Sequence, residues 1–206
     1  MAVGKKLLIL LKAPVRGLVK TRLAAEVGPD AALLLYRQML EKVFDKMAPI
    51  KEVELHYTPA SEQGLIITLL KPGWNHHPQA EGDLGMRMLQ AFDRAFEAGG
   101  QRVVLIGTDC PEVDTTDIHA AWEALSQHDL VLGPAEDGGY WLIGMKQPQP
   151  ELFNGIHWST GSVLAETTAR AQQLRLRYQL LRTLSDVDTK ADWDAYLARH
   201  SAQVLE

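Results

Sequence analysis

Cysteine is nearly absent from this chain. Its 206 residues contain only Cys110, so no disulfide can form within the chain, which fits a reducing compartment. We therefore expect a cytoplasmic protein. Cys110 could serve as a nucleophile, but nothing in the sequence points to its activation, and we favour a small buried side chain.

Long apolar segments and an excess of positive charge are also missing. No stretch approaches the ~20 apolar residues that a membrane-spanning helix requires, so we expect no span. Residues 7–11 follow two lysines, as in a signal peptide, but this apolar run is too short and no small-residue cleavage site follows it. The formal net charge of −5 argues against a nucleic-acid partner, whose binding surface would be basic. A small anionic substrate can still be bound by a local cluster of cations.

The chain does contain enough apolar residues for one core. Its length and its hydrophobic content of 46% predict a single domain over residues 1–206. Strands are expected at residues 5–11, 52–57, 103–106, 129–133 and 140–143, and within 174–184. Helices are expected at residues 29–47, 83–98, 115–127, 161–173 and 190–200, with a short one within 61–70. Asp83 is the expected N-cap of the helix at 83–98, and Thr115 or Thr116 that of the helix at 115–127. This alternation predicts an α/β protein, a three-layer α/β/α sandwich with a mostly parallel central sheet. The adjacent His76 and His77 are expected in a surface loop, because two neighbouring side chains cannot share one face of a strand or helix.

The stretch at residues 103–111 predicts a site. Its run of valine, leucine and isoleucine indicates a strand buried on both faces, after which Gly107 frees the backbone and Pro111 prevents the strand from continuing. Asp109 therefore falls at the carboxyl end of a central strand, where open α/β sheets bind ligands. A carboxylate there could hold a divalent cation against phosphate oxygens, or could simply cap the following turn or helix.

A cationic segment at residues 12–23 follows the first expected strand. Its cations and loop formers are Lys12, Arg16, Lys20, Arg22, Pro14 and Gly17. Cations neutralise phosphate charge and a glycine lets backbone N–H groups approach, so we predict a polyphosphate cradle. A merely solvated basic loop is the alternative. The spacing of glycine, lysine and hydroxyl excludes a Walker A motif.

Further motifs follow the other expected strands, and together they resemble one bacterial family. They are the segment at residues 12–22, E-G-D-L-G at 81–85, G-T-D-C-P at 107–111, G-P-A-E-D-G-G-Y at 133–140, W-S-T at 158–160 and D-V-D-T at 186–189. The chain resembles a family of bacterial glycosyltransferases in the nucleotide-diphospho-sugar transferase (GT-A) superfamily, some of whose members are associated with arsenosugar biosynthesis. It is more distantly similar to the 2-phospholactate and molybdopterin guanylyltransferases. The resemblance implies the GT-A, Rossmann-like form of the α/β sandwich.

The resemblance also implies roles for individual residues. Nucleotide binding is implied for Lys12, Ala13, Pro14, Gly17, Lys20, Arg22, Gln79, Gly82, Asp83, Gly85, Arg87 and Thr108. Binding of the sugar or acceptor is implied for Glu136, Gly138, Gly139, Tyr140, Trp158, Ser159 and Thr160. Asp109 and Asp188 would hold Mg²⁺ or Mn²⁺, Asp137 would act as the base, and Lys20 and Arg22 would assist catalysis. The chain lacks both the Asp-X-Asp pattern of many metal-dependent glycosyltransferases and the Gly-X-Gly-Thr-Arg loop of sugar nucleotidyltransferases, so reaction type and metal use follow less directly than the fold.

Three functions remain open at this stage. The first is glycosyl transfer from a nucleotide-sugar to a small acceptor, in which cations stabilise the departing nucleoside diphosphate and a base activates the acceptor hydroxyl. The second is nucleotidyl transfer from a nucleoside triphosphate to a phosphorylated metabolite, which uses the same groups but releases pyrophosphate. The third is a binding protein that keeps the nucleotide pocket without turnover. The density of acids and cations argues against the third function.

Overall fold

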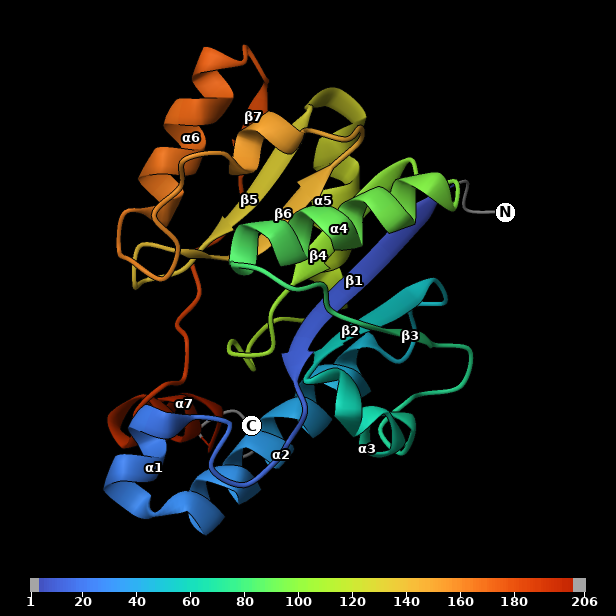
Figure 1. Ribbon diagram of the computed structural model, residues 1–206. Coiled ribbons are helices and arrows are strands. Elements are labelled where there is room, and N and C mark those ends of the chain that lie inside the picture. Colours follow the sequence, from blue (N-terminus) through green and yellow to red (C-terminus); the bar gives the residue numbers. More distant parts are fainter. Residues whose placement is uncertain (1–3, 202–206) are drawn as a thin grey trace.

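A seven-stranded sheet forms the centre of the computed structural model, which describes residues 4–201 (Figure 1). The strands are β1 (Lys5–Lys12), β2 (Val53–Thr58), β3 (Asn75–Pro78), β4 (Arg102–Ile106), β5 (Leu130–Pro134), β6 (Tyr140–Met145) and β7 (Tyr178–Leu180). Their order across the sheet is β3-β2-β1-β4-β6-β5-β7. All neighbours are parallel except β6, which runs antiparallel to β4 and β5. The predicted mostly parallel sheet is confirmed.

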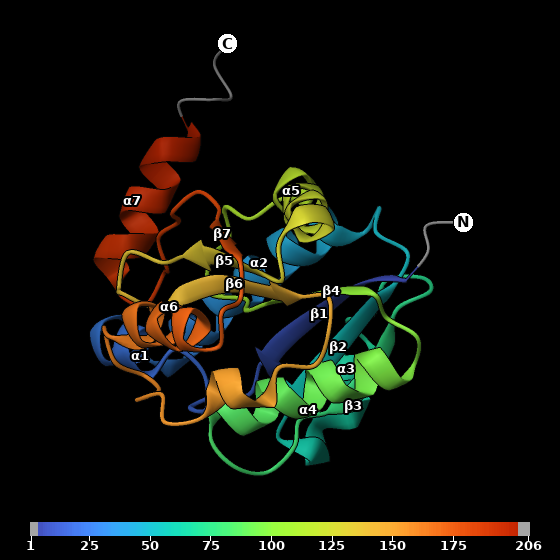
Figure 2. The same ribbon diagram turned by 90° about the horizontal axis from the view of Figure 1, so that it is seen from above.

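Helices cover both faces of this sheet, as the view from above shows (Figure 2). They are α1 (Thr21–Val27), α2 (Pro29–Met47), α3 (Gln63–Ile67), α4 (Leu84–Glu97), α5 (Thr115–Gln127), α6 (Val163–Gln173) and α7 (Lys190–Ser201), with short 3₁₀ helices η1 (Ala60–Glu62) and η2 (Pro150–Phe153). One core joins α2, α3 and α5 to the sheet, and a second joins α4, η2 and α6 to its other face. The three-layer sandwich is therefore confirmed.

The strand β1 shows why two helical layers are needed. Its consecutive apolar residues point alternately to the two faces, so Leu7 and Ile9 belong to one core while Leu8 and Leu10 belong to the other. The strand β4 divides in the same way between the two cores. A strand that is apolar on both faces must be covered on both, and this places β1 and β4 at the centre of the molecule.

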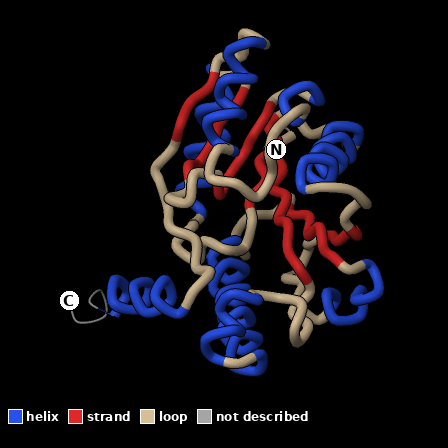
Figure 3. The backbone as a smooth tube through the Cα atoms, turned by 60° about the vertical axis from the view of Figure 1, so that its left-hand side comes forward, coloured by secondary structure: helices blue, strands red, loops and turns tan. Residues whose placement is uncertain are grey.

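The helix α7 lies beside α1 and α2 rather than against the sheet (Figure 3). Trp193 and Tyr196 of α7 pack with Val187 against Met39 of α2. Thr189 and Asp192 exchange hydrogen bonds at the beginning of α7, in the reciprocal pattern of a capping box. The segment that precedes α7 is thereby fixed close to the carboxyl ends of the central strands.

Three local predictions were wrong. His76 and His77 lie on β3 rather than in a loop; β3 is an edge strand with a half-exposed, polar sequence, so it lacks the apolar pattern by which strands are predicted. Residues 21–23 belong to the helix α1 rather than to the cationic loop, and only Leu23 of this short helix is buried. The cap of α5 is Asp114, not Thr115 or Thr116, and it forms a capping box with Asp117.

No helix within residues 4–201 is both long enough and apolar enough to cross a membrane.

Candidate functional site

The loop that follows β4 forms one wall of the site. A side chain added at Gly107 would meet no atom within 4 Å, so the backbone there is open. Thr108 is buried, whereas the carboxylate of Asp109 is 53% exposed. The carbonyl of Asp109 accepts a hydrogen bond from the backbone N–H of Val187, at 2.9 Å. This bond holds the segment before α7 beside the end of β4. Asp188, the next residue along that segment, is thereby brought close to Asp109.

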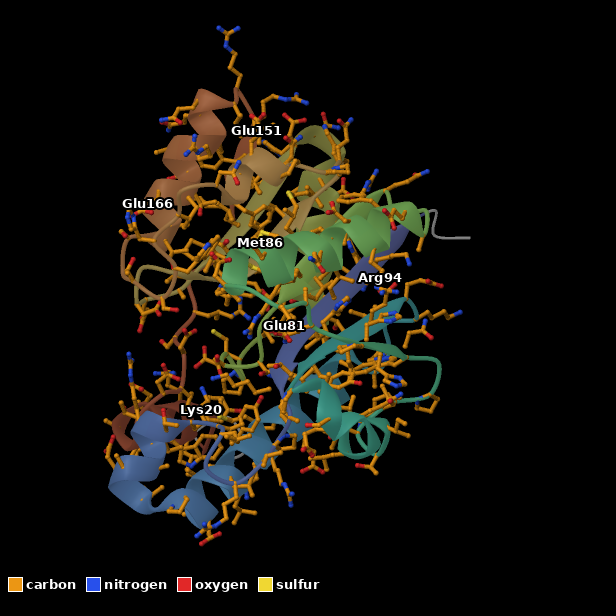
Figure 4. The ribbon with its side chains drawn as sticks, viewed as in Figure 1. Lys20, Glu81, Met86, Arg94, Glu151 and Glu166 are labelled. Carbon is orange, nitrogen blue, oxygen red and sulfur yellow. The ribbon has the colours of Figure 1, made fainter. Side chains whose placement is uncertain are left out.

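Lys20 links these two acids. Its Nζ lies 2.5 Å from Oδ1 of Asp109 and 2.9 Å from Oδ1 of Asp188, and only 5% of its side chain is exposed. Lys20 precedes α1 in a left-handed backbone conformation, with φ 46° and ψ 51°. Figure 4 shows Lys20 near α1, at the end of the molecule where β1 finishes. The structure thus brings together a predicted catalytic cation and both predicted metal ligands.

Arg22 lies on the solvent side of the same cluster. Its guanidinium is 3.7 Å from Oδ2 of Asp188, and its side chain is 79% exposed. Arg16, from the same segment, is instead paired with Asp30 of α2, at 2.6 Å. The two arginines of the predicted cradle therefore differ in their partners, since Arg22 lies beside the acids whereas Arg16 is paired with α2.

The carboxylates of Asp109 and Asp188 keep the Lys20 ammonium protonated. Burial lowers the pKa of the Lys20 ammonium, but the attraction of Asp109 and Asp188 outweighs burial, and its pKa is raised above the usual value. The ammonium consequently stays protonated at neutral pH and offsets the repulsion between the two carboxylates.

Asp186 is a further acid beside the cluster, and the sequence prediction did not select it. Its Oδ1 accepts a hydrogen bond from the thiol of Cys110, at 2.6 Å. Burial raises the pKa of Asp186 to about 6. The hydrogen bond from Cys110 lowers this pKa, whereas the negative charges of Asp137, Asp109 and Asp188 raise it further. Burial also raises the pKa of the Cys110 thiol, which argues against a nucleophilic thiolate. The alternation of acids at positions 186 and 188 was the signal that could have identified Asp186.

The carboxyl end of β1 is fixed by Tyr36 of α2. The Tyr36 hydroxyl donates to the carbonyl of Lys12 at 2.9 Å and lies 3.4 Å from Oγ1 of Thr108. Ala13 is buried and its N–H donates to Thr58 of β2. Pro14 is buried and Gly17 is exposed, with φ 79°. Tyr36 was not selected, because nothing in the sequence indicates that its hydroxyl lies beside Lys12 and Thr108.

The segment from residue 79 to residue 87 joins β3 to α4. The amide of Gln79 donates to the carbonyls of Leu11 and His56, which fixes the end of β3 against β1. The side chain of Asp83 caps α4, as predicted, by accepting from the N–H of Met86. Gly82 has φ 110°, and its carbonyl accepts from Nε of Arg87. A groove of about 510 Å³ between the end of β3 and α4 has Gln79 and Arg87 in its lining.

Gly85 has a specific packing role at the start of α4. A side chain there would come within 2.5 Å of the indole of Trp158. Trp158 is half-buried and also stacks with Phe153. Ser159 and Thr160 are exposed, and Thr160 bonds to the carbonyl of His157 within its own turn.

The turn between β5 and β6 carries Asp137. Its Oδ1 accepts the N–H of Gly139 at 2.8 Å, and the side chain is exposed. Gly138 has φ 88°, and a side chain there would come within 2.1 Å of the carbonyl of Gly161. Glu136 accepts from the hydroxyl of Ser185, at 2.7 Å.

Tyr140, the first residue of β6, turns its hydroxyl inward. The hydroxyl is buried beside Thr167 of α6 without a hydrogen bond of good geometry, and burial raises the pKa of Tyr140. The turn thus brings Asp137 within electrostatic reach of Asp186, whereas the Tyr140 hydroxyl is directed into the protein.

The donor set of Asp109 and Asp188 fits a divalent cation. Two carboxylate oxygens that share one ammonium at 2.5 and 2.9 Å can share a metal ion, and both side chains are accessible. Within residues 4–201 no group of three or more His, Cys, Asp or Glu side chains is arranged to hold a metal. Two carboxylates, completed by phosphate oxygens and water, are nevertheless the usual protein ligands of Mg²⁺ beside a nucleotide.

Known proteins share this arrangement of the chain. A crystal structure from Desulfovibrio desulfuricans G20, provisionally described as a nucleotide-diphospho-sugar transferase, is 34% identical, with a TM-score of 0.86 over 91% of this chain and 83% of that one. Two relatives are named phosphoenolpyruvate guanylyltransferase. The one from Sphaerobacter thermophilus is 24% identical over 88% of this chain and 87% of its own length. The one from Chloroflexus aggregans is 32% identical, but the match spans only 49% of this chain and 48% of the relative.

A family model described as "Uncharacterized protein conserved in bacteria (DUF2064)" matches residues 42–160, from α2 through the turn that follows Trp158. This range is more than half of the chain and contains the loop after β4 and the turn of Asp137. The chain belongs to the DUF2064 family, with the fold of the nucleotide-diphospho-sugar transferases.

Proposed function

We propose that this protein is a metal-dependent nucleotidyltransferase that joins a nucleoside monophosphate unit to a small anionic acceptor. The observation that carries the proposal is the cluster of Asp109, Lys20 and Asp188 at the carboxyl ends of the central strands, with Arg22 exposed beside it. Such a cluster offers carboxylates to a metal and an exposed guanidinium to phosphate oxygens, which is what a nucleoside triphosphate requires.

The reaction needs little chemistry from the protein itself. An acceptor oxygen attacks the α-phosphorus of the triphosphate, the bond from that phosphorus to the bridging oxygen breaks, and pyrophosphate leaves with the electron pair. When bound, Mg²⁺ or Mn²⁺ would supply charge neutralisation at the phosphates. Arg22 would stabilise the departing pyrophosphate, and the backbone of residues 79–85 would receive the base.

An anionic acceptor would not require Asp137 to act as a general base. A phosphate or carboxylate acceptor is already deprotonated at neutral pH, so no general base is needed. One oxygen of Asp137 is engaged by the N–H of Gly139, so only the other oxygen is open to an acceptor. The names of the two guanylyltransferase relatives, whose acceptor is phosphoenolpyruvate, support an acceptor of this class.

Glycosyl transfer is the second candidate. It is favoured by the 34% identity with the Desulfovibrio protein, which extends over nearly the whole chain. The remaining oxygen of Asp137 would then activate an acceptor hydroxyl. The association with arsenosugar biosynthesis, implied by the family resemblance, remains a prediction within this candidate.

Product analysis tests the two candidates directly. The protein is incubated with Mn²⁺ or Mg²⁺ and a panel of nucleoside triphosphates with phosphorylated acceptors, phosphoenolpyruvate included, and in parallel with nucleotide-sugars. Pyrophosphate as the metal-dependent product supports nucleotidyl transfer, whereas a nucleoside diphosphate identifies glycosyl transfer. Binding without either product identifies a non-catalytic nucleotide-binding protein. Asp137→Asn sharpens the test, because it lowers glycosyl transfer roughly 10²-fold if Asp137 is the base but leaves transfer to an anion nearly unchanged.

A further inference from the structure

The side chains of the ionic cluster differ in their exposure to solvent, and Lys20 is the least exposed of them. The Lys20 side chain is 5% exposed, while those of Asp109, Asp188 and Arg22 are 53%, 42% and 79% exposed. The Lys20 side chain is therefore shielded from solvent although it contacts two accessible carboxylates. A phosphate that approaches from solvent reaches Arg22 and the carboxylates more readily than the Lys20 ammonium.

Lys20 is held in this position against the preference of its backbone. A residue with a side chain at φ 46° is in the left-handed region, which costs on the order of 1 kcal/mol relative to the right-handed region. Two charge-assisted hydrogen bonds from the buried ammonium offset that cost. The cluster thus already contains a cation, supplied by the chain itself.

We propose that Lys20 is an internal counter-cation of the Asp109–Asp188 pair, which keeps the affinity of the free protein for divalent metal low. This inference rests on the proposed function, because it concerns the metal that the reaction would use. With Lys20 in place the pair carries one net negative charge instead of two. Even at the dielectric constant of water, one unit charge a few ångströms from a divalent ion changes its affinity about tenfold.

The consequence is an order of binding. A metal ion alone meets a pair of carboxylates that are already neutralised in part, and it binds weakly. A metal ion that arrives with a polyphosphate brings its own anionic ligands, and Arg22 adds a contact to the phosphates. Lys20 is therefore a positioning residue that favours entry of the metal together with the nucleotide, rather than a group that contacts the substrate.

The test measures binding of Mn²⁺ alone, by calorimetry or by electron paramagnetic resonance, without nucleotide. Lys20→Met removes the charge and should raise Mn²⁺ affinity tenfold or more, and Lys20→Gln should do the same while keeping a hydrogen-bond donor. Lys20→Arg keeps the charge and should remain near the wild type. All three replacements have a β-carbon and meet the same backbone cost, so the comparison isolates the charge. Thermal unfolding of each variant verifies that it is folded.

Matched variants locate the effect. Arg22→Met removes an exposed cation that lies 3.7 Å from one of the two acids, Asp188, and should raise Mn²⁺ affinity less than Lys20→Met does, because Lys20 contacts both acids at shorter distances. Adding Asp109→Asn to Lys20→Met should abolish the gain. Unchanged or weaker Mn²⁺ binding in both Lys20→Met and Lys20→Gln overturns the proposal. Because no nucleotide is present, this result is independent of the product analysis, which alone decides the reaction.

Discussion

Replacing Asp186 with asparagine should change the stability of this protein in a manner that depends on pH. The pKa of Asp186 is raised to about 6 from 3.8, chiefly by burial. Between these values the folded state binds a proton that the unfolded state releases, so the folded state loses stability as pH rises from about 4 to about 6. Asparagine cannot ionise, yet its amide oxygen can still accept the hydrogen bond from Cys110.

The size of the effect follows from the shift. About two pKa units at 1.36 kcal/mol each give an upper limit of about 3 kcal/mol. Asp186 is only half-buried and water screens its neighbours, so we expect about 1–2 kcal/mol. For a chain of this length that corresponds to roughly 2–8 °C in melting temperature.

The assay is thermal or urea unfolding of the wild type and Asp186→Asn at intervals from pH 4 to pH 8, with a chelator present. The variant should match the wild type near pH 4 and exceed it above pH 6. Asp192→Asn is a control of opposite sign: burial raises the pKa of Asp192, but hydrogen bonds from Thr189 and Asp188 outweigh it and the pKa is lowered. That variant should lose stability at neutral pH and match the wild type in acid. Parallel curves for Asp186→Asn and the wild type across the whole range would refute the argument.

Three other predictions concern binding and packing. Arg22→Ala should weaken binding of a nucleoside diphosphate roughly tenfold, with little change for the nucleoside. Arg16→Ala is the control and should affect neither ligand, because the Arg16 guanidinium is paired with Asp30. Titration calorimetry measures both affinities, and equal losses for nucleoside and diphosphate would contradict a phosphate contact. Asp109→Asn should abolish the metal-dependent part of nucleotide affinity while the protein stays folded, although its melting temperature falls because the ion pair with Lys20 is weakened. The exposed Asp45→Asn is the control, and retention of the metal-dependent affinity would remove Asp109 from the metal site. Gly85→Ala should displace the indole of Trp158, which lowers the free energy of unfolding by about 1–3 kcal/mol and changes the tryptophan fluorescence. Gly64→Ala is the control: its new methyl group meets no atom within 4 Å, so it should be neutral or stabilising. Equal effects of the two replacements would contradict the close approach of Gly85 to Trp158.

The fold could be predicted because its central strands carry an unambiguous pattern. Runs that are apolar on both faces, as in β1 and β4, require covering layers on both sides, and caps such as Asp83 mark where helices begin. The edge strand β3 escaped prediction because only one strand pairs with it and half of its surface meets solvent, so its sequence need not be apolar.

Individual residues of the candidate site could be predicted from the sequence, but the contacts between them could not. Asp109 could be selected from its position after a central strand and Asp188 from the family resemblance, but no local pattern states that Lys20 contacts both of them. Asp186 was not selected because its state depends on Cys110, which is distant in sequence and was interpreted only as a filler. Contacts of this kind are decided by packing of α7 against α2, which sequence spacing does not encode.

The pairing of Lys20 with Asp188 joins residues 168 positions apart. During synthesis, the first strand, its loop and all the strands of the sheet leave the ribosome before Asp188 does. Until then Lys20 is a cation with at most one of its two partners, in a backbone conformation that it does not prefer. All the strands of the sheet are therefore synthesised before the ion pair can form, and a chain released before residue 188 would contain every strand but lack the partner that pairs Lys20 with the segment before α7.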